Sequence, residues 1–128
     1  MALSDDLERI AAAQHEPVTG VLATELADGA RVYLCAYESG AWLAFDDAGK
    51  PVESRRVVRE AASLAALCEV AEDIAGELEP PPRLATNAYL DAVGAAAGPD
   101  FAGVFAQAAP AVEELVAEIE RSYKLPLS

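Results

Sequence analysis

The sequence predicts an α+β domain. We expect an N-terminal helix, a three-stranded antiparallel β-meander, and then three to four helices that pack on the sheet. Two turn signals, Asp28-Gly29 and Ser39-Gly40, separate three runs that are rich in β-branched and aromatic residues. The longest apolar pattern, over residues 55–77, instead repeats at helical spacing. At 128 residues, the chain is expected to form a single domain that spans residues 1–128.

The first expected element is a helix over about residues 4–14. Ser4 or Asp5 can cap its N-terminus, and apolar side chains recur along it at spacings of three and four. Pro17 ends any helix and precedes the first strand. A lone histidine at a helix C-terminus is favoured by the helix dipole, so we assign His15 no catalytic role.

The meander is expected over residues 18–46. Turns of two residues would place Leu22 opposite Cys35, and Leu34 opposite Phe45. Because side chains alternate along a strand, this register predicts two different faces. The aliphatic face, which we assign to the core, comprises Val21, Ala23, Val32, Leu34, Ala36, Leu43 and Phe45. The aromatic face comprises Leu22, Thr24, Leu26, Arg31, Tyr33, Cys35, Tyr37 and Trp42.

The aromatic face is the first candidate binding surface. Tyrosine and tryptophan favour positions that are apolar on one side and wet on the other. Aromatic residues and arginine also anchor many protein interfaces. We therefore expect Arg31, Tyr33, Tyr37 and Trp42 to bind a second copy of the chain, another protein or a ligand.

Four helices are expected after the meander. The first covers residues 55–77, with Ser54 as its N-cap, and its broad apolar stripe is expected to pack on the aliphatic face. Residues 51–53 form either a short extra strand or the approach to this helix. The three prolines at 80–82 end the helix. The remaining helices are expected at about residues 84–97, 100–107 and 109–123.

The formal net charge is −13 at pH 7. This charge repels nucleic-acid phosphates and anionic membrane surfaces, so we expect neither as a partner, whereas a basic protein partner remains compatible with it. Asp91, Pro99, Asp100 and Pro110 interrupt the most apolar stretch, which excludes a membrane span. Two cysteines and no signal peptide predict a reducing cytoplasm. Abundant alanine and an excess of arginine over lysine are typical of a GC-rich bacterial genome.

The sequence contains no phosphate loop, dinucleotide fingerprint, nucleophile elbow or zincin motif. It also has no cluster of histidine, cysteine or aspartate residues at the spacing of metal ligands. We expect Cys35 and Cys68 to be unbonded and inert, because no base lies near either in the sequence pattern. No catalytic residue, metal or cofactor is therefore expected.

Arg55, Arg56 and Arg59 cluster at a helix N-terminus, where the helix dipole disfavours cations. Arrangements that oppose a local preference sometimes mark function, and this cluster could bind an anion. The more ordinary outcome is ion pairing with acidic neighbours. The acidic candidates are Asp46, Asp47, Glu53 and Glu60, of which Glu60 has the helical spacing to pair with Arg56.

Three functions remain open. The leading one is a non-enzymatic protein-interaction module that homodimerises through the aromatic face. The second is a binding or sensor domain for a small anionic metabolite. Its pocket would have Trp42, Tyr89 and Phe101 as walls and an arginine of the cluster as the anion ligand. The third, an enzyme that uses Cys35 or a carboxylate, ranks last because no catalytic constellation is visible.

Overall fold

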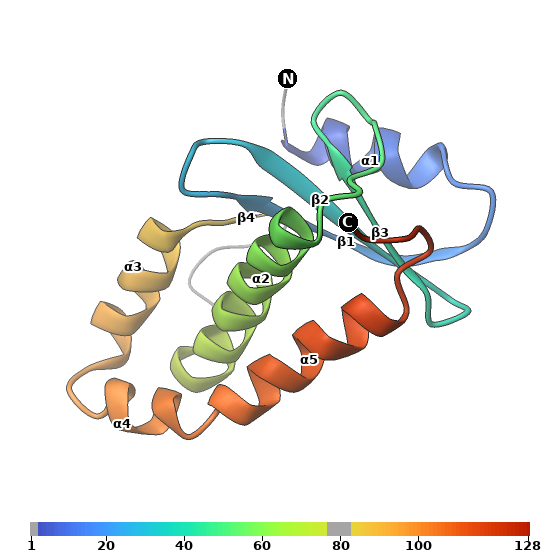
Figure 1. The fold of residues 1–128 in the computed structure, drawn as a ribbon. Coiled ribbons are helices and arrows are strands. Elements are labelled where there is room, and N and C mark those ends of the chain that lie inside the picture. The colour runs from blue at the N-terminus through green and yellow to red at the C-terminus, as the bar shows by residue number, and fades with distance from the viewer. Residues whose placement is uncertain (1–2, 77–82) are drawn as a thin grey trace.

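The structure is a computed structural model, and it describes residues 3–76 and 83–128. The elements in chain order are α1 (Leu3–Ala12), β1 (Val18–Glu25), β2 (Arg31–Tyr37), β3 (Trp42–Asp46), α2 (Arg55–Ala75), β4 (Leu84–Ala85), α3 (Asn87–Ala97), α4 (Phe101–Ala106) and α5 (Ala109–Arg121). This order confirms the predicted α+β class, with an N-terminal helix, three antiparallel strands and then helices. The sheet lies between α1 on one face and α2 and α5 on the other (Figure 1).

Local signals mark both ends of α2. Ser54 caps α2 as predicted, and its side chain accepts a hydrogen bond from the backbone N–H of Val57. α2 ends at Ala75, before Gly76 with its positive φ of 84°, and the three prolines expected to end it lie outside the described residues. Among the described helices, none is long and apolar enough to cross a membrane.

The sheet has a fourth strand that was not predicted. The strand order is β3-β2-β1-β4, and Leu84 and Ala85 of β4 pair in parallel with Ala23 and Thr24 of β1. We expected these two residues to begin a helix, and that boundary is wrong. The Thr86 side chain accepts a hydrogen bond from the Tyr89 N–H, so the helix begins only at Asn87.

The predicted register of the meander is wrong by one residue. Each hairpin has a loop of three residues, because the Leu26 N–H donates to Ala30 O and the Tyr37 N–H donates to Ala41 O. Gly29 and Gly40 take the last loop position with φ values of 87° and 93°. This geometry is the three-residue hairpin with a left-handed glycine, and not the two-residue turn that we expected.

Because of this one-residue shift, each side chain of β1 and β3 lies on the opposite face from the β2 side chains with which it was expected to group. Tyr33 lies opposite Ala23 on one side and Phe45 on the other, so Phe45 shares a face with Tyr33. Trp42 pairs with Ala36 and lies on the opposite face. The predicted separation into an aliphatic and an aromatic face is therefore wrong, and both faces carry a mixture.

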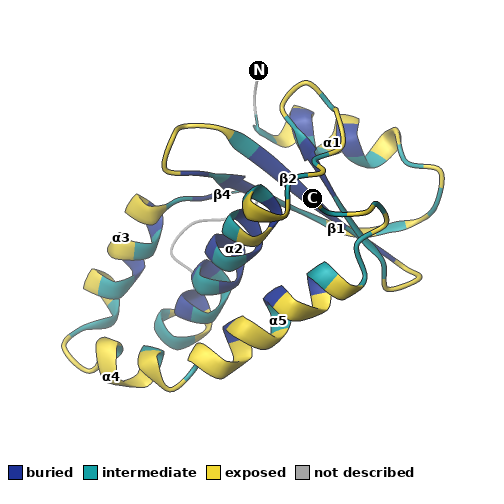
Figure 2. Cartoon of the chain, viewed as in Figure 1, coloured by how far each residue is buried: buried dark blue, intermediate teal, exposed yellow. Residues whose placement is uncertain are grey.

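Helices cover both faces of the sheet, and Figure 2 shows the buried centre of the strands in dark blue. The face that meets α2 and α5 forms the first core, with buried members Leu26, Val32, Leu34, Ala44, Val58, Ala61, Ala62, Ala65, Val116 and Ile119. The face that meets α1 forms the second core, with buried members Ile10, Ala23, Tyr33, Cys35, Tyr37 and Phe45. A third core joins α2 to α3 and comprises Leu64, Cys68, Ala71, Ala85, Tyr89 and Val93.

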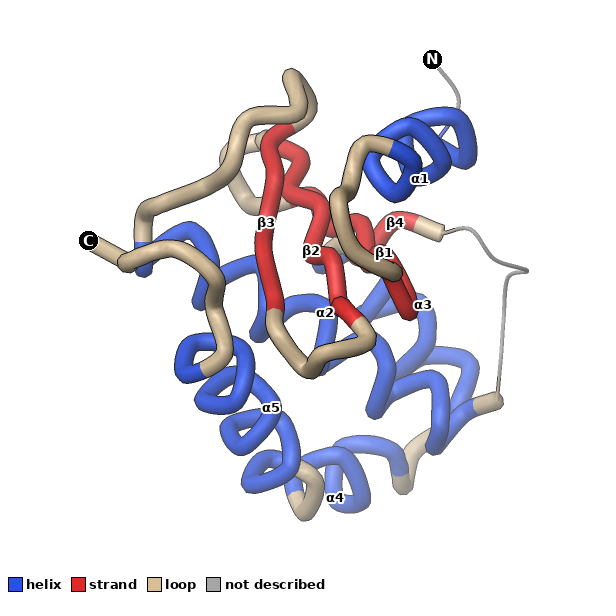
Figure 3. The backbone as a smooth tube through the Cα atoms, turned by 90° about the vertical axis from the view of Figure 1, so that its right-hand side faces the viewer, coloured by secondary structure: helices blue, strands red, loops and turns tan. Residues whose placement is uncertain are grey.

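Chain segments outside the strands occupy the outer edge of β3. The Trp42 N–H donates to Ser122 O, the Lys124 N–H donates to Trp42 O, and the Val52 N–H donates to Ala44 O. Figure 3 shows the C-terminal loop beside β3. The short extra strand considered at 51–53 is reduced to a single bridge between Phe45 and Pro51. This covering matters because an open edge strand can template aggregation.

The loop geometry can be tested at Gly40. Replacing Gly40 with alanine is expected to lower the free energy of unfolding by about 1 kcal/mol, because an L side chain is strained at positive φ. Gly20 in β1 is the control, since its φ is not positive and an added Cβ would meet nothing within 4 Å. Gly20→Ala should be neutral or slightly stabilising in urea unfolding followed by circular dichroism. Equal effects of the two substitutions would contradict the loop assignment.

Candidate binding site

The four residues expected to form an aromatic binding surface are divided between the two faces of the sheet. Tyr33 and Tyr37 are 0% and 3% exposed beneath α1. Arg31 is half-buried, and its Nε lies 3.7 Å from a Glu25 carboxylate oxygen. Trp42 is half-buried on the other face, against the first core. These four side chains therefore do not form one shared, open surface.

The two tyrosines instead attach the N-terminal segment to the sheet. The Tyr33 hydroxyl donates to Asp6 Oδ2 at 3.1 Å, and the Tyr37 hydroxyl donates to Gln14 Oε1. Lys124 lies 4.4 Å from the centre of the Tyr37 ring and forms an ion pair with Glu16. Burial raises the pKa of Tyr33 and raises that of Tyr37 to about 12, so both hydroxyls stay protonated at neutral pH.

Both cysteines are free and buried, as expected. Burial raises the pKa of the Cys35 and Cys68 thiols to about 11, which suppresses the thiolate at neutral pH. The Cys68 thiol donates to the backbone carbonyl of Thr86 at 3.8 Å. Among the described residues, no group of three or more histidine, cysteine, aspartate or glutamate side chains could hold a metal ion.

The pocket expected between the meander and the later helices does not form from its three predicted walls. Trp42 packs against the first core, between the sheet and α5. Tyr89 and Phe101 belong to the third core, with α2 and α3. The first half of α2 packs on the sheet and α5, and the second half packs on α3. Trp42 therefore lies in a different core from Tyr89 and Phe101.

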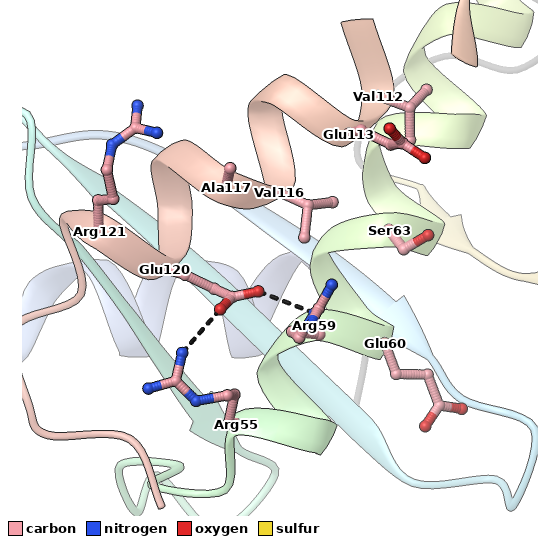
Figure 4. A pocket seen from close by; sticks show the side chains of 10 residues that line it. All are labelled: Arg55, Arg59, Glu60, Ser63, Val112, Glu113, Val116, Ala117, Glu120 and Arg121. Atoms are coloured by element: carbon pink, nitrogen blue, oxygen red, sulfur yellow. Dashed lines mark hydrogen bonds and ion pairs between the residues drawn. The ribbon is translucent and has the colours of Figure 1, made fainter. Parts of the chain in front are cut away.

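The arginine cluster divides into two parts. Arg55 Nη1 and Arg59 Nε each lie 2.8 Å from one oxygen of the Glu120 carboxylate on α5 (Figure 4). Arg56 Nη1 lies 3.6 Å from Glu60, which is the pair that helical spacing indicated. Glu120 was not among the predicted partners. No local sequence signal connects it to α2, since 65 residues separate it from Arg55.

Arg55 and Arg59 line a groove between α2 and α5, with a volume of about 940 Å³. Three apolar residues of α5 contribute to it: Val112, Val116 and Ala117. Figure 4 shows the two arginines and Glu120 at one end and Glu113 at the other. A smaller cavity of about 300 Å³ lies between α1, β1, β4 and α2, and is lined by Leu7, Val21 and Cys68 among others.

A second exposed feature is the end of the molecule remote from the sheet. Residues 92–111, here called the distal tip, comprise the end of α3, all of α4 and the start of α5, and Asp100 is their only charged residue. α4 has no buried residue, and Val104 is 47% exposed. The exposed apolar and small residues of the tip are Ala92, Ala95, Ala96, Pro99, Ala102, Gly103, Val104, Ala106, Ala109, Pro110 and Ala111. Figure 2 shows α4 and the first turns of α5 mostly in yellow, as exposed.

The distal tip was visible in the sequence as an uncharged stretch. The sequence predicts helices there and excludes a membrane span, but whether those helices are exposed depends on how they pack. Comparison with protein-family models, curated proteins and solved structures finds no match to this chain.

Proposed function

We propose that this chain is a non-enzymatic protein-interaction module that forms a homodimer through the distal tip. One observation carries the proposal: an exposed, nearly uncharged apolar surface on a chain whose net charge is −13. Exposed apolar patches on soluble proteins commonly mark interaction sites. Two free, buried thiols fit a reducing compartment, so the proposal places the module in the cytoplasm.

The charge distribution favours a second copy as the occupant of the tip. Two chains of equal net charge repel each other over most of their surface, and the repulsion is least where charges are absent. A basic partner would instead be attracted to the acidic surface elsewhere. The tip presents the same small apolar residues from each copy, which suits a two-fold interface in which one patch meets itself. Phe101 and Phe105, with ring centres 5.0 Å apart, lie half-buried in the tip and offer flat apolar area.

Val104→Glu is expected to weaken the dimer by roughly tenfold or more, because the interface would bury a carboxylate without a partner. The measurement is molar mass by light scattering across a dilution series, with circular dichroism as a check on folding. The control is Ala27→Glu in the first hairpin loop. Glu38 already occupies the equivalent position of the second loop, so the control adds the same charge where it is tolerated.

Two outcomes would reject the proposal. One is a wild-type chain that stays monomeric up to its solubility limit. The other is a dimer that responds equally to Val104→Glu and Ala27→Glu. A dimer that dissociates only in the Val104→Glu variant would locate the interface at α4.

A further inference from the structure

The groove between α2 and α5 contains guanidinium donors that are only partly used. Arg55 and Arg59 each direct one nitrogen at Glu120, and an arginine side chain carries five N–H donors. Their other nitrogens contact no acidic or hydrogen-bonding group in the described part of the chain. The two side chains are 51% and 61% exposed, whereas that of Glu120 is 16% exposed. The arginines are thus open to solvent while already converging on one carboxylate.

The charges along the groove are ordered. Glu120 lies between the two arginines, and each of its carboxylate oxygens contacts one guanidinium group. Its carboxylate is therefore positioned as the carboxylate or phosphate group of a bound ligand would be. Glu60 is paired with Arg56. Glu113 lies at the far end, about 10 Å from Glu120 along α5 at 1.5 Å per residue. The groove is therefore positive at one end and negative at the other.

Val116 and Ala117 lie between these two ends, and Val112 lies beside Glu113. Val112 and Val116 are each 7% exposed, and Ala117 is exposed. A volume of about 940 Å³ is within the range of small-molecule sites. A ligand with an anionic group at one end and an apolar chain could place the anionic group against the two arginines and the apolar chain against the valines.

We propose that this groove binds a small organic anion with an apolar body, whose carboxylate or phosphate group is held by Arg55 and Arg59 in place of Glu120. The site is separate from the distal tip, and its occupation does not depend on the dimer. Glu120 acts as an internal competitor in the empty groove, so its charge sets the affinity for the ligand.

The test uses five probes of defined chemistry, measured by calorimetry and by chemical-shift titration with the full chain. Octanoate is expected to bind more tightly than acetate, because only octanoate covers the apolar floor. Octylammonium, with the same chain and the opposite charge, is expected not to bind. Octanedioate is expected to bind more weakly than octanoate, because its second carboxylate approaches Glu113. Octyl phosphate, compared with octanoate, distinguishes the two head groups.

Matched variants locate the site. Arg59→Gln should weaken octanoate binding by roughly three- to fivefold, as expected for one partly exposed charged contact. Arg56→Gln removes the same charge from the same helix but from a residue that does not line the groove, so it should weaken octanoate binding less than Arg59→Gln does, even though it leaves Glu60 without its partner. Glu120→Gln keeps the shape of the side chain but removes the competing charge, and should raise the affinity by a similar factor. Val104→Glu should leave octanoate binding unchanged, which separates this site from the proposed dimer.

Each alternative result would overturn the proposal. The first is equal affinity for octanoate and octylammonium. The second is an equal loss of octanoate affinity in Arg59→Gln and Arg56→Gln. The third is no gain in octanoate affinity in Glu120→Gln, provided that circular dichroism shows this variant to be folded. Absence of saturable binding by any of the anionic probes would also overturn it.

Discussion

Replacing Leu34 with alanine is expected to lower the free energy of unfolding by about 3 kcal/mol. Leu34 is fully buried on β2, between Leu22 of β1 and Ala44 of β3. It belongs to the first core, where the sheet packs on small α2 residues such as Ala61. The methyl groups of these α2 alanines cannot reorient to fill the volume left by the leucine side chain. The substitution therefore leaves a cavity in addition to removing apolar contact.

Leu67→Ala is the matched control for Leu34→Ala. Leu67 lies on α2, is half-buried, and belongs to none of the three cores. Its loss should reduce the free energy of unfolding by about 1 kcal/mol. Urea unfolding can be followed by circular dichroism and by the fluorescence of Trp42, the only tryptophan. Similar losses for the two variants would show that Leu34 does not occupy the centre of the core.

The second large effect is an expected loss of stability above pH 9. Burial raises the pKa of Cys35 and of Cys68 from the ordinary 9.0 to about 11. It also raises the pKa of Tyr37 from 10.0 to about 12. Between pH 9 and 11 the unfolded chain therefore loses protons that the folded chain keeps, which favours unfolding as the pH rises. Each cysteine contributes at most about 1.4 kcal/mol per pH unit in this window, and the two together contribute about 5 kcal/mol by pH 11.

Cys68→Ser tests the origin of the alkaline effect. Serine has nearly the same shape, does not titrate in this range, and can still donate to the Thr86 carbonyl. The variant should therefore lose clearly less stability than the wild type between pH 9 and 11, whatever its stability at pH 7. Urea unfolding at fixed ionic strength, repeated at each pH, measures the difference. An identical decline in both proteins would mean that Cys68 is accessible to hydroxide in the folded state.

The one-residue difference in register originates in the hairpin loops. Asp28-Gly29 and Ser39-Gly40 fit the sequence pattern of a two-residue type I′ turn, in which both residues need positive φ. A three-residue loop needs positive φ only at its glycine, and it suits Ser39 better, because serine rarely adopts that conformation. A third loop, over residues 47–49, follows the same pattern, with the Asp46 N–H donating to Lys50 O. The correct register was thus accessible from turn chemistry, although side-chain alternation alone could not distinguish it.

The arginine cluster shows a different limit. The Arg56–Glu60 pair follows from spacing within one helix turn and was predictable. The Arg55 and Arg59 pairs with Glu120 depend on α5 returning to lie beside α2. Nothing within either helix indicates that approach, so the groove and its internal carboxylate could be found only in three dimensions.

The sequence by itself determined the order and type of most elements, the Ser54 cap and the α+β class. Helical spacing, capping residues and turn glycines act over a few neighbouring residues, so they can be read along the chain. Only the tertiary structure decided which side chains share a face, that α1 covers Tyr33 and Tyr37, and that much of the distal tip remains exposed. The reason is that a one-residue change of register moves every side chain of a strand to the other face, and burial depends on which distant helix packs there.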